Sequence, residues 1–71
     1  MTASGRAARL KAARREAGFA SAVAAADAHG WKRNTYAANE NGNSPFSFRK
    51  ARQYAAAFNV DAEWLYDAGA A

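Results

Sequence analysis

The sequence contains no cysteine, a single histidine and a single proline. Without cysteine the chain can form neither a disulfide framework nor a thiolate metal site. No apolar run approaches the length of a membrane span, and none follows the basic N-terminal residues as in a secretory signal. We therefore expect a cytoplasmic protein with no metal, no cofactor, no membrane association and no evident small-molecule ligand.

Residues that carry enzymatic chemistry are also scarce. The lone histidine, His29, has no second histidine or cysteine to join it, so we expect it to be a partly buried residue at a helix end. No Gly-rich phosphate loop follows a strand, and no paired carboxylates fall on an expected cleft wall. The sequence therefore argues against an enzyme.

The length of 71 residues suits one domain, which we place at 1–71 with an ordered core over about 6–67. Alanine dominates the apolar residues, and it favours helices that approach one another closely. We expect an all-α fold. Its large apolar side chains are Leu10, Phe19, Trp31, Tyr36, Phe46, Phe48, Tyr54, Phe58, Trp64, Leu65 and Tyr66.

The positive charge is concentrated in one part of the chain. The formal net charge is +4, and all ten lysines and arginines lie at or before Arg52. Asp61, Glu63 and Asp67 make the end of the chain acidic. One end can therefore sit on a polyanion while the other faces away, although an ordinary basic surface remains the alternative.

Capping residues and glycines divide the chain into five short predicted helices. A serine or aspartate precedes most of them, and a glycine or asparagine follows. The predicted helices are 6–17, 22–29, 33–41, 48–58 and a short one that ends near Gly69, with N-caps at Ser4, Ser21, Ser47 and Asp61, a stop at Gly18 and a turn at Gly30.

Apolar residues at spacings of three and four predict which helical faces are buried. In the third helix Tyr36 should face the core, with Arg33, Asn34 and Ala37 on the outer surface. The other expected inward residues are Leu10, Ala13 and Ala17; Phe48, Ala51, Ala55 and Phe58; and Trp64 with Leu65 as a lid.

Arg14 lies at the edge of the apolar face of the first helix. It could be solvated, or it could reach inward for a carboxylate. From the residues alone, the solvated arginine is the favoured interpretation.

The segment from Gly30 to Gly42 combines a basic, polar first turn with alanines behind it. A short helix of this kind, with little bulk on its exposed middle, suits insertion into the DNA major groove. The alternative is one more surface helix of a basic bundle.

Several residues together narrow this hypothesis to a family. The order Arg-x-x-x-Gly at 14–18, Gly30, Glu-Asn-Gly at 40–42, Pro45 and Ala-x-x-Phe-Asn-Val-Asp-x-x-Trp-Leu at 55–65 resembles the Cro/CI-type (XRE) helix-turn-helix family of phage and bacterial repressors. The resemblance covers about residues 6–67. It implies a compact five-helix, lambda-repressor-like domain with the helix-turn-helix at about 22–41 and a recognition helix at 33–41.

The resemblance also implies roles for individual residues. Arg14 would pair with Glu40. This pairing replaces the interpretation of Arg14 as a solvated side chain. The implied base contacts are Arg33, suited to guanine, Asn34, suited to adenine, and Ala37 and Ala38, which offer only methyl groups, as to thymine. The expected DNA backbone contacts are Ser21, Lys32, Thr35, Asn41, Asn43, Arg49 and Lys50.

Three residues depart from the family pattern. Ala22 stands where many members carry a glutamine that braces the recognition helix, so that contact should be missing. Asn39 occupies a position that is more often apolar, which puts local core packing in doubt. Lys32 replaces a small capping residue, so the third helix should start less firmly.

The resulting expectation is a transcriptional regulator, a repressor that binds a palindromic operator in double-stranded DNA as a homodimer. Trp64 and Tyr66 are the expected dimer contact. The alternative is an antitoxin or protein-interaction module that uses the C-terminal helix, with DNA binding secondary. Nonspecific RNA binding is less favoured, because the aromatic residues fall at core spacings rather than in an exposed stacking row.

Overall fold

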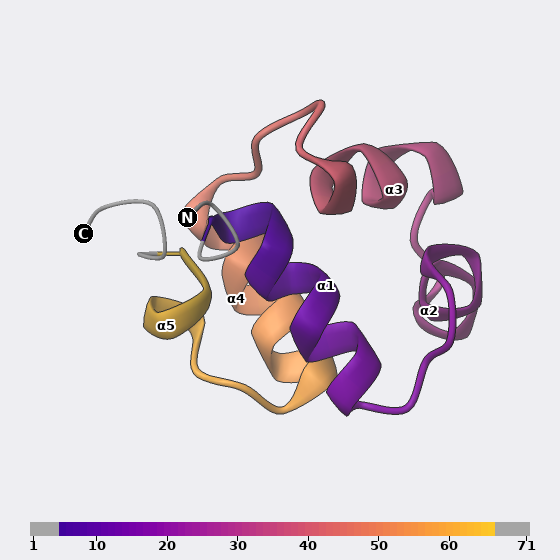
Figure 1. The fold of residues 1–71 in the computed structure, drawn as a ribbon, viewed down its shortest axis with the longest axis horizontal. Helices are drawn as coiled ribbons and strands as arrows, with labels where there is room; N and C mark the ends of the chain where they lie inside the picture. Colours follow the sequence, from indigo (N-terminus) through magenta and orange to yellow (C-terminus); the bar gives the residue numbers. More distant parts are fainter. Residues whose placement is uncertain (1–4, 67–71) are drawn as a thin grey trace.

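The computed structural model describes residues 5–66, which form five α-helices and no strand (Figure 1). The prediction of an all-α fold is therefore confirmed. The helices are α1 (Arg6–Glu16), α2 (Ala22–His29), α3 (Arg33–Asn41), α4 (Phe48–Phe58) and α5 (Ala62–Tyr66).

The capping signals explain why the helix bounds follow the sequence so closely. Ser21, Ser47 and Asp61 each accept a hydrogen bond from a backbone N–H three residues later, as predicted. The first helix ends at Glu16, one residue earlier than expected. The predicted cap Ser4 and the predicted stop near Gly69 lie outside the described residues.

The helices pack around α1 and α4, which lie side by side at the centre of Figure 1. The α2–α3 pair lies on one side of them, and α5 lies on the other. Helix α1 contacts all four other helices. It therefore couples the two sides of the domain.

An aromatic cluster fills the space between α3 and α4. The Trp31 ring lies 5.2 Å from Tyr36, 4.8 Å from Tyr54 and 5.7 Å from Phe58, measured between ring centroids. It also stacks on His29 at 4.5 Å. Edge-to-face and offset contacts of this kind add to the free energy of simple apolar burial. His29 is half-buried at the end of α2, as expected.

Small residues let the helices approach one another around this cluster. Ala25 and Ala26 of α2 are fully buried, and so is Ala51 of α4. Leu10 and Leu65 close the core from α1 and α5. A short chain thereby obtains a dense interior from few large side chains.

Three apolar residues expected in the core are exposed to solvent. Ala17 is exposed, because α1 ends at Glu16 and Ala17 stands at its C-cap. Phe48 is 39% exposed, because it stands at the first position of α4, where its ring packs edge-on against Tyr66. Trp64 is 40% exposed, so only Leu65 closes the core. The predicted inward stripe of α4 was wrong at Phe48 and omitted Tyr54, which is buried.

Asn39 does not disturb the packing, although its position is usually apolar in the family that the sequence resembles. The residue is buried, and its Nδ2 donates to the Ser44 carbonyl at 3.0 Å. The Tyr54 hydroxyl donates to its Oδ1 at 2.7 Å. A buried amide with both ends satisfied avoids the desolvation cost of an isolated polar group.

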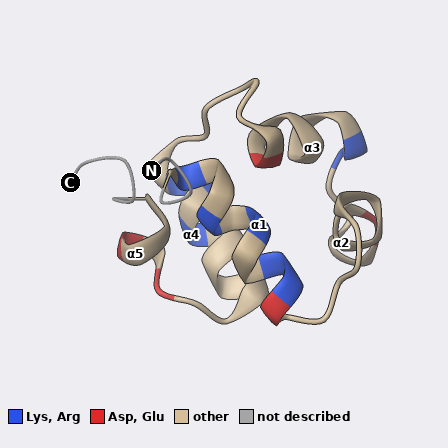
Figure 2. Cartoon of the chain, viewed as in Figure 1, with Lys and Arg blue, Asp and Glu red and all other residues tan. Residues whose placement is uncertain are grey.

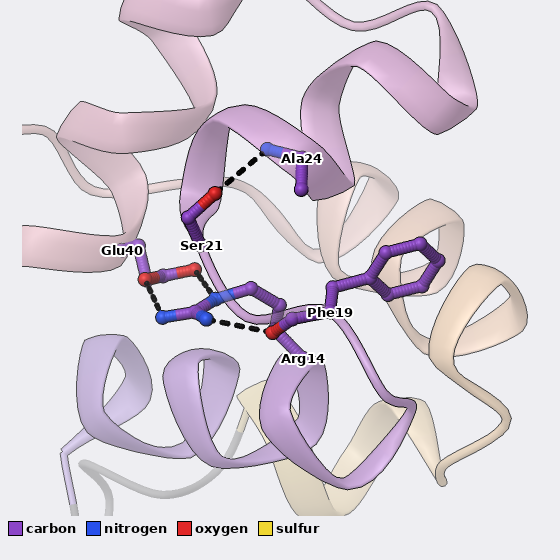
Figure 3. Close-up of polar contacts among 5 residues, drawn as sticks. All are labelled: Arg14, Phe19, Ser21, Ala24 and Glu40. Carbon is purple, nitrogen blue, oxygen red and sulfur yellow. Dashed lines mark hydrogen bonds and ion pairs between the residues drawn. The ribbon is translucent and has the colours of Figure 1, made fainter.

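A buried ion pair joins α1 to α3 (Figure 3). Arg14 Nε and Nη2 donate to the two carboxylate oxygens of Glu40 at 2.9 and 2.8 Å. Arg14 Nη1 donates to the Phe19 carbonyl at 2.8 Å, so the loop before α2 is held as well. Two parallel N–H···O bonds fix orientation as well as distance.

The ion pair shifts the pKa of both partners toward the charged forms. Burial is the largest single influence on Glu40 and would raise its pKa, but its neighbours, first among them Arg14 through its hydrogen bonds and its charge, together lower the pKa. The same bonds raise the pKa of Arg14. The solvated interpretation of Arg14 is wrong, since its side chain is 5% exposed.

We expect the hydroxyls of the two buried core tyrosines to contribute very differently to stability. Tyr54→Phe should lower the free energy of unfolding by about 1–3 kcal/mol, because it leaves Asn39 Oδ1 buried without a donor. Among the described residues, the Tyr36 hydroxyl is buried without a hydrogen-bond partner. Burial raises the pKa of this hydroxyl, and the nearby Glu40 carboxylate adds to the rise. Tyr36→Phe should be neutral or stabilising. Urea denaturation measures the free energy of unfolding of both variants. An equal loss of stability in the two would contradict this expectation.

Removing one partner of the buried ion pair should be costly. Arg14→Ala leaves the Glu40 carboxylate buried alone and should cost about 3–5 kcal/mol in the free energy of unfolding. Arg15→Ala is the matched control, because Arg15 is the next residue on α1 and is exposed. Thermal unfolding followed by circular dichroism measures both, and a similar melting temperature for the two variants would show that the pair does not anchor α3.

Candidate nucleic-acid interface

The turn between α2 and α3 is set by one residue with a left-handed backbone. Gly30 has φ 73°, and its N–H bonds to the carbonyls of Ala26 and Asp27 at the end of α2. The Trp31 N–H also bonds to the Ala26 carbonyl, at 2.9 Å. A Cβ at position 30 would be strained, so glycine suits this tight turn. The chain then enters α3 at a fixed angle to α2.

Helix α3 has one anchored face and one open face. Tyr36, Asn39 and Glu40 are buried. Glu40 binds Arg14 of α1, and Tyr36 and Asn39 contact Tyr54 of α4. Arg33 and Asn34, in the first turn, are exposed, as the periodicity predicts. The buried side chains therefore fix which part of α3 faces outward.

The remaining residues of the open face are small or polar. Lys32 and Thr35 are exposed, whereas Ala37 and Ala38 are half-buried. Lys32 occupies the N-cap position of α3 and makes no side-chain cap hydrogen bond, as expected. The middle of the helix therefore presents little bulk to an incoming surface.

Arg33 is already engaged by a neighbour. Its Nε and Nη2 donate to the two carboxylate oxygens of Asp27 on α2 at 2.8 and 2.9 Å. Both side chains stay largely exposed, at 64% for Arg33 and 49% for Asp27. The hydrogen bonds from Arg33 lower the pKa of Asp27. Sequence reasoning missed this contact.

Three of the predicted backbone-contact residues line one hollow between α3 and α4. Lys32, Thr35 and Lys50 lie around a space of about 290 Å³ whose wall includes Trp31 and Tyr54. The Lys50 ammonium is 5.8 Å from the Tyr54 ring centroid. Lys32, at the N-cap of α3, and Lys50, in the first turn of α4, therefore line the same hollow.

The other predicted backbone-contact residues are placed separately. Ser21 caps α2 by accepting from the Ala24 N–H at 3.0 Å (Figure 3). Asn41 Oδ1 accepts from the Asn43 N–H at 2.9 Å and shapes the turn that leaves α3. Arg49 is exposed at the start of α4 and does not line the hollow.

The basic residues follow α1 and the first turns of α3 and α4 in Figure 2. The acidic residues Asp61 and Glu63 lie before and within α5, across the domain from α3, although the basic residues at the start of α1 lie beside α5. This arrangement matches the charge asymmetry of the sequence. A polyanion would meet the α3 side more favourably than the α5 side.

The residues predicted for a dimer contact are both covered on one side by arginines from α1. The Arg9 guanidinium lies 4.8 Å from the Trp64 ring centroid, and Arg9 Nη1 donates to the Trp64 carbonyl at 2.8 Å. The Arg6 guanidinium lies 3.8 Å from the Tyr66 ring centroid, and Arg6 Nε donates to the Tyr66 carbonyl. These contacts fix α5 on α1 and leave part of the Trp64 ring exposed.

The described residues contain neither a cluster of metal ligands nor a membrane-spanning helix. Among residues 5–66, no three histidine, aspartate or glutamate side chains gather as a metal site requires. Each helix in the same range is too short or too polar to cross a membrane.

Comparison with known proteins supports the motif that α2, the Gly30 turn and α3 form. A family model described as a helix-turn-helix domain matches residues 7–65, which is most of the chain. No curated protein and no solved structure matches the chain. The match spans all five helices except the ends of α1 and α5. The chain therefore belongs to the helix-turn-helix domain family, which indicates a DNA-binding protein.

Proposed function

We propose that the chain is a sequence-specific, DNA-binding transcriptional regulator in which α3 enters the major groove. One observation carries the proposal: Arg33 and Asn34 are exposed in the first turn of α3, while Tyr36 and Glu40 anchor its opposite face. A recognition helix needs this division, because its outer side chains must reach base edges from a fixed position.

The side chains of the open face suggest how bases are recognised. Arg33 can donate two hydrogen bonds to guanine O6 and N7, and Asn34 can pair with adenine N6 and N7. Ala37 and Ala38 offer methyl groups, which suit contact with thymine. Because these two alanines are half-buried, α3 can approach the floor of the groove closely.

The DNA backbone contacts are proposed to surround α3. Lys32, Thr35 and Lys50 would bind phosphate at the hollow that they line. Arg49, which is exposed at the start of α4, would add a further backbone contact. Ser21 and the amides at the start of α2 would bind a second phosphate, and Asn41 and Asn43 a third. Such contacts position the protein without distinguishing sequences.

The resemblance to Cro/CI-type (XRE) repressors supports a more specific proposal. The chain, taken as one domain over 1–71, would act as a cytoplasmic repressor that associates with the nucleoid and occludes a promoter. Two copies would bind a palindromic site with their α3 helices in successive major grooves, roughly 34 Å apart. Symmetry supports this, because a single domain reads only a few base pairs.

The dimer is tested by comparing a symmetric site with a half site. Once a preferred duplex is known, we expect two copies to bind it cooperatively and the half site to bind much more weakly. Trp64→Ala should weaken only the symmetric complex if the partly exposed Trp64 ring contacts the second copy. Gel-shift titration measures the affinity for each site, and analytical ultracentrifugation measures how many copies bind. Equal affinity for the half site and the symmetric site would exclude the dimer.

Arg33 should carry sequence discrimination. Arg33→Ala is expected to weaken binding to the preferred duplex about ten- to a hundredfold and to affect random duplex DNA much less, because a bidentate contact to guanine is lost. Fluorescence anisotropy with both duplexes measures the difference. Equal losses on the two duplexes would show that Arg33 only contacts phosphate.

Lys50 should contribute to affinity without contributing to discrimination. Lys50→Ala is expected to weaken binding to every duplex and to reduce the slope of log K against log salt by about 1. Arg52→Ala is the matched control, because Arg52 is exposed on the same helix and does not line the hollow. If both variants change the slope equally, the hollow is not a phosphate site.

A second candidate function is an antitoxin or protein-interaction module that uses the α5 end, with DNA binding secondary. Phe48 and Trp64 are 39% and 40% exposed. Phe48 packs against Tyr66, the last residue of α5. These aromatic groups could contact a partner protein. DNA affinity that vanishes at moderate salt, with no preferred sequence, would favour this function over the first.

A further inference from the structure

The contact between Asp27 and Arg33 joins the two helices of the motif at the point where bases would be read. Arg33 is the first residue of α3, and Asp27 lies in the last turn of α2. The carboxylate accepts from Nε and Nη2, so it occupies one edge of the guanidinium. The geometry is bidentate and in-plane, which fixes the direction of the side chain.

Stability does not account for this pair. An acid near a helix C-terminus and a cation at a helix N-terminus both oppose the helix macrodipole. Asp27 and Arg33 therefore each stand at the less favourable end of their own helices. The pair is also largely exposed, and exposed ion pairs add little to stability. The main effect of the Asp27–Arg33 pair is that it holds the Arg33 side chain in one position.

The Asp27 contact leaves the reading edge of Arg33 open. A guanidinium has five N–H donors, of which this contact uses one on Nε and one on Nη2. The two Nη1 hydrogens and the second Nη2 hydrogen remain. One from each nitrogen forms a terminal fork, and such a fork matches guanine O6 and N7.

We propose that Asp27 is a specificity-determining residue that acts through Arg33. It holds the arginine with its terminal fork presented for guanine, so less side-chain freedom is lost on binding. Its negative charge also opposes association with phosphates wherever guanine is absent. This inference rests on the proposed function, because it assigns a role at the same α3 surface.

The test is selection from a pool of randomised duplex DNA with four proteins: the unmodified chain, Asp27→Ala, Arg33→Ala and Glu63→Ala. The guanine position that Arg33→Ala no longer prefers identifies the base that Arg33 reads. Glu63→Ala is the matched control, since it removes the same charge from an exposed residue of α5, across the domain from α3. Circular dichroism checks that each variant is folded.

We expect Asp27→Ala to lower the preference for guanine at that position by about two- to tenfold. The reason is that the Arg33 side chain is no longer held in one conformation before it binds. The affinity of this variant for random duplex DNA should be unchanged or higher. Asp27→Asn keeps one acceptor at nearly the same shape, so its loss should be intermediate. Glu63→Ala should leave the guanine preference unchanged.

Three results would overturn the inference. If Asp27→Ala strengthens the guanine preference, the carboxylate competes with DNA for Arg33. If Asp27→Ala changes the guanine preference no more than Glu63→Ala does, the Asp27–Arg33 pair has no role in specificity. If the unmodified chain selects no sequence at all, the proposed function fails together with this inference, and the unmodified protein alone reveals that.

Discussion

The arrangement of the domain depends on the buried guanidinium of Arg14. It bonds to both carboxylate oxygens of Glu40 on α3 and to the Phe19 carbonyl, so one side chain of α1 holds α3 and the loop that leads into α2. An ion pair in this setting is costly to break, because the remaining charge is left without water. With Glu40 fixed, the rotation of α3 about its own axis is fixed too, and Arg33 and Asn34 face outward.

The rest of the interior makes this geometry possible in a short chain. Trp31, at the end of the Gly30 turn, packs between the tyrosines of α3 and α4, and fully buried alanines let α2 lie close to its neighbours. Few large side chains are needed, because they meet in one cluster. Polar groups that enter this interior are mostly satisfied, as at Asn39. The rigid base leaves the open face of α3 available for recognition.

Local signals in the sequence were enough to predict the helices and the open face of α3. Ser21 and Ser47 cap helices through bonds that span three residues, and Gly30 permits a left-handed turn by its own conformation. Contacts between residues far apart in the sequence were harder to predict. The partners Arg14 and Glu40 are 26 residues apart, and the residues alone favoured a solvated Arg14 until the family resemblance suggested the pair. The Tyr54–Asn39 bond and the Asp27–Arg33 pair gave no periodic signal, because each joins two helices whose relative position the pattern does not encode.

We propose that the open face of α3, together with the starts of α2 and α4, is the surface that binds DNA. The most direct measurement is an NMR titration of the ¹⁵N-labelled chain with duplex DNA at moderate salt. We expect the largest amide shifts at the start of α2, over 32–38 and around Asn43 and Lys50, with little change over α5. Shifts centred on α5, or none at any residue of α3, would contradict the proposal.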